Sequence, residues 1–397
     1  MGDTTSTTAT IRAGLPRVAA ATGEGPRFDH LRPVWRVTVK GQDISGRIAP
    51  RLVSLSITDN RDGEADEVEI VISDHDGAVE LPDTGDTLTV AIGWQFDSSR
   101  PQPQQPPAED AKEKEKEPEQ PNIAGFPLGL IDKGSYTIQA VEYSGSPDTI
   151  TLRARAANLL DELRTVKDRS WHKTTVGTIV RSIAAQNQLK VSVDKEIEAR
   201  KVPHADQAHE SDASFLRRLG RQMDCLCNIK NGTLLFSQAR KARTPSGKVL
   251  PTVVIVRGDG DQHRWARADR DSYSGAKAFY NNIKRGTRSS VIAGLAGRAK
   301  TLRQTFASEA DALAAARAEW LRIQRGIYSF EMTLAYGRAD LMPQRPVVVR
   351  GYKKQIDETE WIVVGVRHSL GSSGYTSQMT LETKQAEGGD EVLSARF

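Results

Sequence analysis

The sequence has few of the features that mark a membrane-bound, secreted or disulfide-bonded protein. It contains only two cysteines in 397 residues, and no apolar run approaches the roughly twenty residues that a membrane span needs. The first residues carry no apolar stretch of the kind found in a secretion signal. Cys225 and Cys227 are one residue apart, a spacing that rarely closes as a disulfide because its geometry is strained. We therefore expect a soluble chain with reduced cysteines and no membrane anchor.

The familiar catalytic motifs are missing as well. The sequence has no Gly-x-Ser-x-Gly, no His-Glu-x-x-His and no Gly-x-x-x-x-Gly-Lys. Its acidic residues lie mostly on alternating polar faces, so no carboxylate pair is singled out for glycoside hydrolysis. The charge is nearly balanced, with 55 basic and 51 acidic residues, and favours no polyanionic partner. We predict no enzyme, no catalytic residue and no cofactor.

One cluster resembles a metal site, and it comprises His204, His209, Glu210, Cys225 and Cys227. The two histidines have the spacing of zinc ligands, but the cysteines are one residue closer than the Cys-x2–4-Cys pattern requires. Glu210 and the serine after it also form a plausible helix start. We predict that this cluster binds no metal.

A basic stretch runs from Lys284 to Arg303 and includes Arg285, Arg288, Arg298 and Lys300. A nucleic-acid footprint would interleave aromatic residues with the cations for stacking. Here only Tyr280 and Phe306 flank the stretch. We interpret it as a solvent-facing or partner-facing loop without specific nucleic-acid binding.

Alternation of apolar and polar residues predicts antiparallel strands in the first third of the chain. The pattern follows a polar leader, residues 1–26, which we expect to be disordered. It occurs in six stretches, which are Val34–Val39, Val53–Ile57, Val68–Ile72, Leu88–Ile92, Tyr136–Ala140 and Ile150–Ala154. These stretches predict a first β-barrel-like domain over residues 27–160.

The strands are interrupted by residues 97–123, which contain six prolines and a Lys/Glu repeat. Such a segment buries too little apolar surface to offset its ordering entropy, so we predict that it is disordered. Closing a loop of this length costs only about 2–3 kcal/mol. We therefore interpret residues 97–123 as an insert between two strands of one domain.

The middle region, residues 161–244, has a mixed α/β pattern. Helical spacing predicts an amphipathic helix over Val176–Ala184, capped by Thr174 or Thr175. Leu189–Val193 is typical of a strand. A second helix is predicted to start at Ser211 or Asp212, with Phe215, Leu216, Leu219 and Met223 buried. Asn231-Gly232 then predicts a hairpin turn between Cys225–Ile229 and Leu234–Phe236.

The last region, residues 245–385, returns to strands and precedes a short tail, residues 386–397. Strands are expected at Val249–Val256, Tyr280–Lys284, Phe330–Leu334, Val347–Val349, Trp361–Val366 and Ser377–Leu381. A helix is predicted to begin at Ser308, with Leu313, Ala316, Trp320 and Ile323 as its apolar positions. The pattern therefore predicts a second β-barrel-like domain with one helix.

Two segments resemble the phage late control gene D family, whose members build the central hub of contractile-tail baseplates. The first runs from Trp171 to Leu219 and contains Gln207, Glu210, Ser211, Asp212 and Phe215 in the expected order. The second comprises Pro346–Gly351, Trp361–Ser369, Gly374–Ser377 and Met379–Leu381. The similarity extends from about residue 34 to 384, and the insert 97–123 departs from it.

The resemblance implies a mainly β protein with an α+β middle, in which two β-barrel-like tube domains flank a mixed α/β domain. Three copies would form a trimeric, pseudo-sixfold ring that joins a sixfold tail tube to a threefold spike. The implied partners are the spike, the tail tube, the tape-measure protein and other baseplate proteins. The implied location is the baseplate of the virion tail or of a phage-like particle, after assembly in the cytoplasm of the bacterial host. A tail-associated cell-wall hydrolase and a type VI secretion spike or hub component remain the alternatives.

Overall fold

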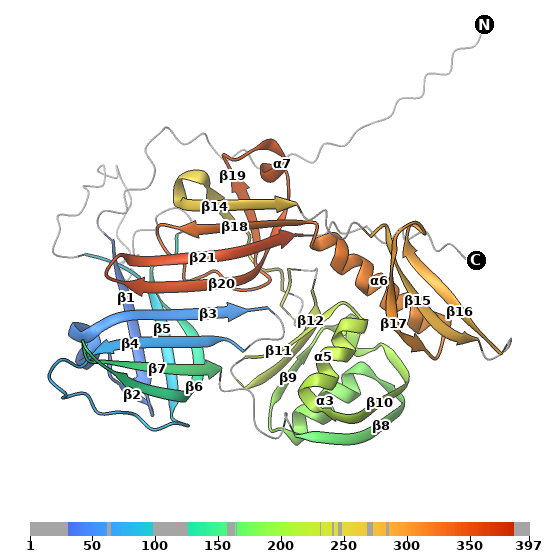
Figure 1. Ribbon diagram of the computed structural model, residues 1–397, viewed down its shortest axis with the longest axis horizontal. Coiled ribbons are helices and arrows are strands. Elements are labelled where there is room, and N and C mark those ends of the chain that lie inside the picture. Colours follow the sequence, from blue (N-terminus) through green and yellow to red (C-terminus); the bar gives the residue numbers. More distant parts are fainter. Residues whose placement is uncertain are drawn as a thin grey trace, which may run out of the picture.

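The computed structural model describes residues 31–61, 65–97, 126–156, 163, 165–230, 232–239, 242–244, 248–267, 273–282 and 286–384. The predicted leader 1–26, the insert 97–123 beyond Asp97, and the tail 386–397 lie outside the described residues. Figure 1 shows four packed parts: two β lobes, one above the other at the left, a mixed α/β unit at the lower right, and a small unit that includes helix α6 at the right.

The two lobes share one 13-stranded sheet, in the order β14-β18-β21-β20-β3-β4-β7-β6-β5-β1-β2, with β19 and β13 attached at β20. The sequence predicts two β-barrel-like domains; the mainly β architecture is confirmed, but the described strands form no closed barrel. The path ends in two edge strands, β14 and β2, because the lobes pair with each other through β20 and β3 instead of each closing on itself.

The first lobe contains the predicted strands of the N-terminal third. They are β1 (Leu31–Val39), β2 (Gln42–Asp43), β3 (Leu52–Asn60), β4 (Glu67–Ser73), β5 (Thr87–Phe96), β6 (Gly129–Ser144) and β7 (Thr149–Ala156), with α1 (Ser45–Ile48) and η2 (Ala49–Arg51) between β2 and β3. The predicted alternation is confirmed for most positions, including Leu55 and Ile70, which are fully buried. Val53, at 47% exposed, and Ala140, which is also exposed, are exceptions because each lies at a register shift, the first between β3 and β4 and the second between β6 and β7.

The second lobe is built from strands that are far apart in the sequence. They are β13 (Val253–Val256), β14 (Gly260–Arg267), β18 (Tyr328–Leu334), β19 (Pro346–Arg350), β20 (Trp361–Gly371) and β21 (Gly374–Thr383), with η3 (Arg257–Asp259) and α7 (Lys354–Asp357). Phe330, Trp361 and Leu381 lie at the centre of its core. This core is distinct from that of the first lobe, although the first lobe's core also includes Leu370 of β20 and Tyr375 of β21.

The joint between the lobes combines strand pairing with buried polar contacts. Residues Gly365–Gly371 of β20 pair antiparallel with Ser54–Asn60 of β3. The Nε1 of Trp94 donates to the carbonyl oxygen of Gly337 at 2.6 Å, and the Trp94 ring lies 5.5 Å from that of Tyr375. Lys133 donates to Asp59 and to the carbonyl oxygen of Leu341, both at 3.1 Å. The two lobes are therefore held as one body.

Replacing Trp94 with Phe tests this joint. The substitution keeps the aromatic contacts but leaves the buried Gly337 carbonyl without its donor, so we expect a loss of about 1–3 kcal/mol in the free energy of unfolding. Chemical denaturation measures it. Trp265→Phe on edge strand β14 is the control, because Trp265 is 37% exposed and should change little. Equal stability of the two variants would contradict the assigned role of Trp94.

The mixed α/β unit follows the first lobe in the chain. It contains β8 (Val166–Thr175), α3 (Val176–Gln186), β9 (Lys190–Val193), α4 (Lys195–Glu198), β10 (Lys201–Ser211), α5 (Asp212–Gln222), β11 (Cys225–Lys230) and β12 (Thr233–Gln238). Both predicted helices are confirmed, with Thr175 and Ser211 as their N-caps. The predicted hairpin is confirmed as the antiparallel pair β11–β12.

The small unit is inserted between β14 and β18 of the second lobe. It consists of a three-stranded sheet, β15 (Gly275–Asn282), β16 (Thr287–Gly294) and β17 (Ala299–Phe306), covered by α6 (Glu309–Arg325). The N-cap Ser308 is confirmed, but the predicted apolar stripe of α6 is shifted. Ala312, Ala315 and Ala316 face the sheet, because small side chains let the helix approach closely, whereas Leu313 and Trp320 are only half-buried. No helix of the described residues is long and apolar enough to cross a membrane.

Candidate interaction site around the Gln207–Asp212 segment

The segment from Gln207 to Asp212 connects β10 to α5 through a β-bulge. The register between β10 and β8 shifts between Gln207 and Glu210, and His209 adopts a positive φ of 48°. The Ser211 side chain then accepts a hydrogen bond from the Ser214 amide and caps α5. Gln207 and Asp212 are fully buried as a result, and Glu210 lies nearer the surface.

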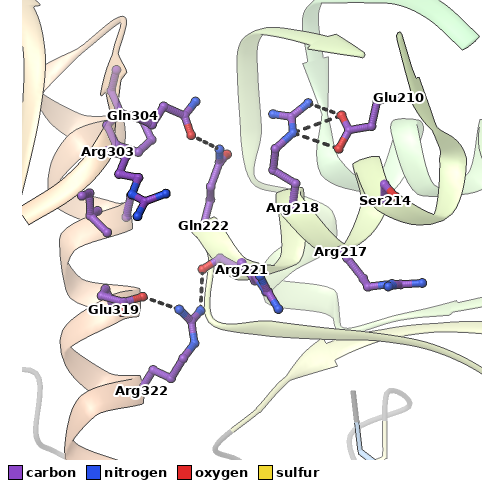
Figure 2. Close-up of a pocket in the computed structure, with 13 residues that line it drawn as sticks. Glu210, Ser214, Arg217, Arg218, Arg221, Gln222, Arg303, Gln304, Glu319 and Arg322 are labelled. Carbon is purple, nitrogen blue, oxygen red and sulfur yellow. Dashed lines mark hydrogen bonds and ion pairs between the residues drawn. The ribbon is translucent and has the colours of Figure 1, made fainter. Parts of the chain in front are cut away.

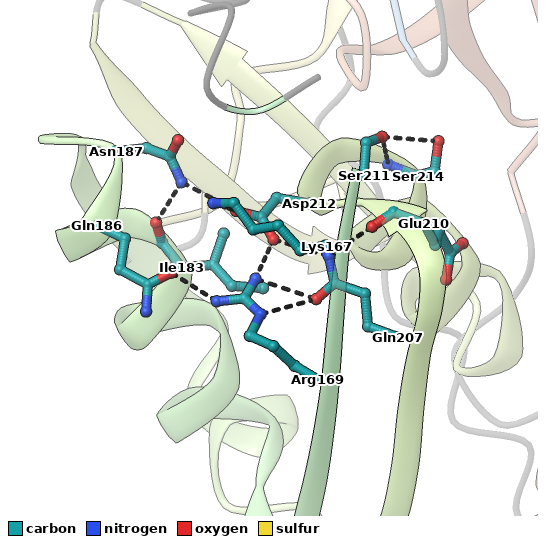
Figure 3. A network of polar contacts seen from close by, with 10 residues as sticks. All are labelled: Lys167, Arg169, Ile183, Gln186, Asn187, Gln207, Glu210, Ser211, Asp212 and Ser214. Carbon is teal, nitrogen blue, oxygen red and sulfur yellow. Dashed lines mark hydrogen bonds and ion pairs between the residues drawn. The ribbon is translucent and has the colours of Figure 1, made fainter. Parts of the chain in front are cut away.

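Asp212 is the centre of a buried polar network, which Figure 3 shows. Its carboxylate accepts hydrogen bonds from Lys167 Nζ at 2.8 Å and from Gln207 Nε2 at 2.9 Å. Arg169 forms an ion pair with the same carboxylate. Asn187 donates to it at 3.3 Å and also donates to the carbonyl oxygen of Ile183 at 2.7 Å. The network therefore joins β8, β10 and α5 to the C-terminal end of α3.

Burial alone would raise the pKa of Asp212. The hydrogen bonds from Lys167, Gln207 and Asn187, together with the charge of Arg169, more than offset this effect and hold the pKa below its ordinary value. The carboxylate is therefore ionised at neutral pH and satisfied on both oxygens. Such a group stabilises the fold, and its solvent exposure of zero leaves it without access to a substrate.

The residues of the cluster that resembles a metal site lie apart. His204 lies next to His172, with 3.0 Å between the Nδ1 atoms, and its Nε2 lies 2.8 Å from Asp206. His209 donates its backbone amide to Asp168, on the other strand. Cys225 and Cys227 lie on β11 and form no disulfide. The described residues contain no group of three or more His, Cys, Asp or Glu placed to hold a metal ion.

Next to the segment lies a groove between α5 and the small unit, which we call the α5–α6 groove. Its larger hollow has a volume of about 550 Å³, with α5 on one side and β17 and α6 on the other (Figure 2). A second hollow of about 340 Å³ continues along β10 and shares Arg218, Gln222 and Gln304 with the first. Gln222 donates to Gln304 at 3.0 Å across the groove.

A buried ion network closes one end of this region and joins all four parts of the structure. Arg325 of α6 donates to both carboxylate oxygens of Asp224, at 2.6 and 2.5 Å. Its Nε also lies 3.4 Å from Glu382 at the end of β21, and Glu382 pairs with Arg61 beside β3. The Arg325 and Asp224 side chains are only 4% and 8% exposed. No sequence pattern points to Asp224 or Glu382. Arg325 carries one signal of a buried ion pair, because it is a charged residue on the buried face of α6.

The basic stretch is divided by the structure. Lys284 and Arg285 lie outside the described residues. The Arg288 guanidinium lies over the ring of Phe279, 3.9 Å from its centre, and Lys300 pairs with Glu319 at 2.7 Å. Arg303 lines the α5–α6 groove. Part of the stretch is thus used within the small unit, and part faces the groove.

Comparison with known proteins identifies the family. The model of the phage tail baseplate hub (GPD) family matches residues 129–374, more than half of the chain. The chain belongs to this family. The baseplate hub family match confirms the resemblance carried by the Trp171–Leu219 and Pro346–Leu381 segments, both of which lie largely or wholly within it.

Individual relatives agree with the family assignment. The chain is 35% identical to the probable baseplate hub protein of Escherichia phage 186, over 90% of this chain and 94% of the relative. It is also 35% identical to the probable baseplate hub protein of Escherichia phage P2, over 90% of this chain and 95% of the relative. The fold is similar to the 43 kDa tail protein of prophage MuSo2 from Shewanella oneidensis. That similarity has a TM-score of 0.60 at 13% identity and covers 88% of this chain and 98% of the other.

Proposed function

We propose that this chain is the central baseplate hub of a contractile phage tail or phage-like particle. In that place it joins the sixfold tail tube to the threefold spike. The observation that carries the proposal is the 35% identity to two phage baseplate hub proteins over nearly their whole length. The same observation favours a phage tail over a type VI secretion assembly.

The architecture offers a physical account of how a hub could match two symmetries. Each chain has two β lobes with distinct cores in one continuous sheet. Three chains would therefore present six lobes, which is a pseudo-sixfold surface for a tube, while remaining threefold for a spike. The joint at β20 and β3 would keep the two lobes of a chain at a fixed spacing. The edge strands β14 and β2 carry unpaired backbone groups, which suits pairing between chains.

The test is to locate the chain in an assembled particle. Tails purified from a producing strain with an epitope tag on this chain are labelled with antibody and imaged by electron microscopy. We expect label on the axis, between tube and spike, and three copies per tail by quantitative mass spectrometry. Label along the tail sheath, or six or more copies per tail, would contradict the proposal.

We further propose that the role is structural, not enzymatic. Support comes from the hub relatives and from the buried, fully paired state of Asp212, the most enclosed carboxylate of the family-like segment. We expect the purified chain to leave the turbidity of a peptidoglycan suspension unchanged, with lysozyme as the positive control. Clearing of the suspension by this chain, and its loss on a single carboxylate substitution, would favour the cell-wall hydrolase alternative instead.

A further inference from the structure

The α5–α6 groove contains more positive charge than its own carboxylates can neutralise. Each carboxylate that lines it already has a partner. Glu210 accepts from Arg218 at 2.8 Å, and Glu319 pairs with Arg322 and Lys300. In the second hollow, Asp206 is bound by His204 and Ser170, and Asp311 by Ser308, at the cap of α6. The acidic side of the groove is therefore satisfied from within.

Three arginines of the groove, in contrast, have guanidinium groups without such a partner among the described residues. Among the described residues, Arg217, Arg221 and Arg303 take part in no side-chain hydrogen bond or ion pair, and Figure 2 marks none from their guanidinium groups. Arg217 and Arg221 stand one turn apart on α5, and Arg303 comes from β17 on the other wall. Like charges at this helical spacing weaken a helix slightly. Charges gathered on concave walls also focus their field into the hollow between them.

Apolar side chains lie among the polar residues of the hollow between the arginines. Leu302, Phe306 and Ala315 line it, with Phe306 8% and Ala315 5% exposed. No strongly exposed aromatic ring is available there for stacking on a base. The chemistry fits separated carboxylates with apolar groups between them better than it fits a nucleic acid.

We propose that the α5–α6 groove binds an acidic segment of another polypeptide. Its carboxylates pair with Arg217, Arg221 and Arg303, and its apolar side chains lie over Leu302 and Phe306. Arginine suits this role because its planar guanidinium binds a carboxylate with two parallel hydrogen bonds. The segment contacts both walls, so its binding also ties the mixed α/β unit to the small unit. This inference goes beyond the hub proposal and does not depend on it.

The test uses the full chain and fluorescence anisotropy. The probe is a fluorescein-labelled peptide of about a dozen residues in which glutamates alternate with leucines. A second peptide carries glutamine in place of each glutamate. We expect the acidic peptide to bind at least about tenfold more tightly than the glutamine peptide, with an affinity that falls as salt is added. Arg221→Glu should weaken binding about tenfold, and Arg221→Glu combined with Arg303→Glu about a hundredfold.

Arg317→Glu is the matched control, because Arg317 is an exposed residue of α6 that does not line the groove. It changes the net charge equally and should leave the affinity for the acidic peptide unchanged. An equal loss of affinity in Arg317→Glu would overturn the proposal, because the overall charge of the protein would then explain the binding. The proposal would also be overturned if a single-stranded oligonucleotide bound more tightly than the acidic peptide and the same charge-reversal variants abolished that binding. A change in oligomeric mass on reversal of Arg221, without peptide, would also overturn it in favour of a second copy of this chain.

Discussion

Replacing Arg325 with Met should lower the free energy of unfolding by about 3–5 kcal/mol. The substitution removes the cation from a buried ion network, which leaves Asp224 without its partner and Glu382 with Arg61 alone. Removing one partner of such a pair leaves an uncompensated buried charge, which is far more costly than losing a surface pair. The effect should also extend beyond α6, because the network contacts both lobes and the mixed α/β unit.

Chemical denaturation followed by tryptophan fluorescence measures this change, with two controls. Arg317→Met on the exposed face of α6 should alter stability by less than about 0.5 kcal/mol. Asp224→Leu combined with Arg325→Met removes the main pair together and should recover part of the loss, because no Asp224 charge is then left unpaired. If Arg325→Met alone were as stable as the parent, the network would not hold the parts together.

Replacing Asp212 with Asn should have an effect of similar size, about 3–5 kcal/mol. The change keeps the shape of the side chain but removes the charge that compensates Lys167 and Arg169 inside the mixed α/β unit. Asp206→Asn, on the half-exposed surface of the preceding strand β10, is the control and should lower stability far less than Asp212→Asn.

The pH dependence of the Asp212 effect has a defined sign. The folded-state pKa of Asp212 lies below its ordinary value, so the folded state favours the ionised form. This stabilisation is fully present above the unfolded pKa, about 3.9, and is lost as the pH falls through the lower folded pKa. The stability difference between the parent and Asp212→Asn should therefore shrink below about pH 4. A difference that grows with acidification would contradict the account of the network.

Local elements of this fold could be predicted from the sequence because their signals are local. The helices after Thr175 and Ser211 follow from helical spacing and a capping hydroxyl, and the β11–β12 hairpin from Asn231-Gly232. The sharing of one sheet by the two lobes depends on β20 pairing with β3, a contact between segments about 300 residues apart, which no local pattern encodes.

The same limit applies to the site. The order Gln207, Glu210, Ser211, Asp212 marked the segment, but periodicity could not tell which of these side chains would be buried. The bulge at His209 decides that by directing Gln207 and Asp212 inward. Helical spacing predicts Ala316 correctly on the buried face of α6 but not Ala312 and Ala315, because alanines carry a weaker hydrophobic signal than Leu313 and Trp320. The groove combines α5 with β17 and α6, and only the tertiary structure brings them together.

The central claim, a threefold hub with six β lobes, is tested most directly by the number of copies in the purified assembly. The chain is co-expressed with the spike protein of its own particle, and the complex is measured by native mass spectrometry. The account predicts three chains of 43.5 kDa per complex, with end-on electron microscopy averages showing a ring around a central opening. A complex that holds one, two or six copies of this chain would contradict it.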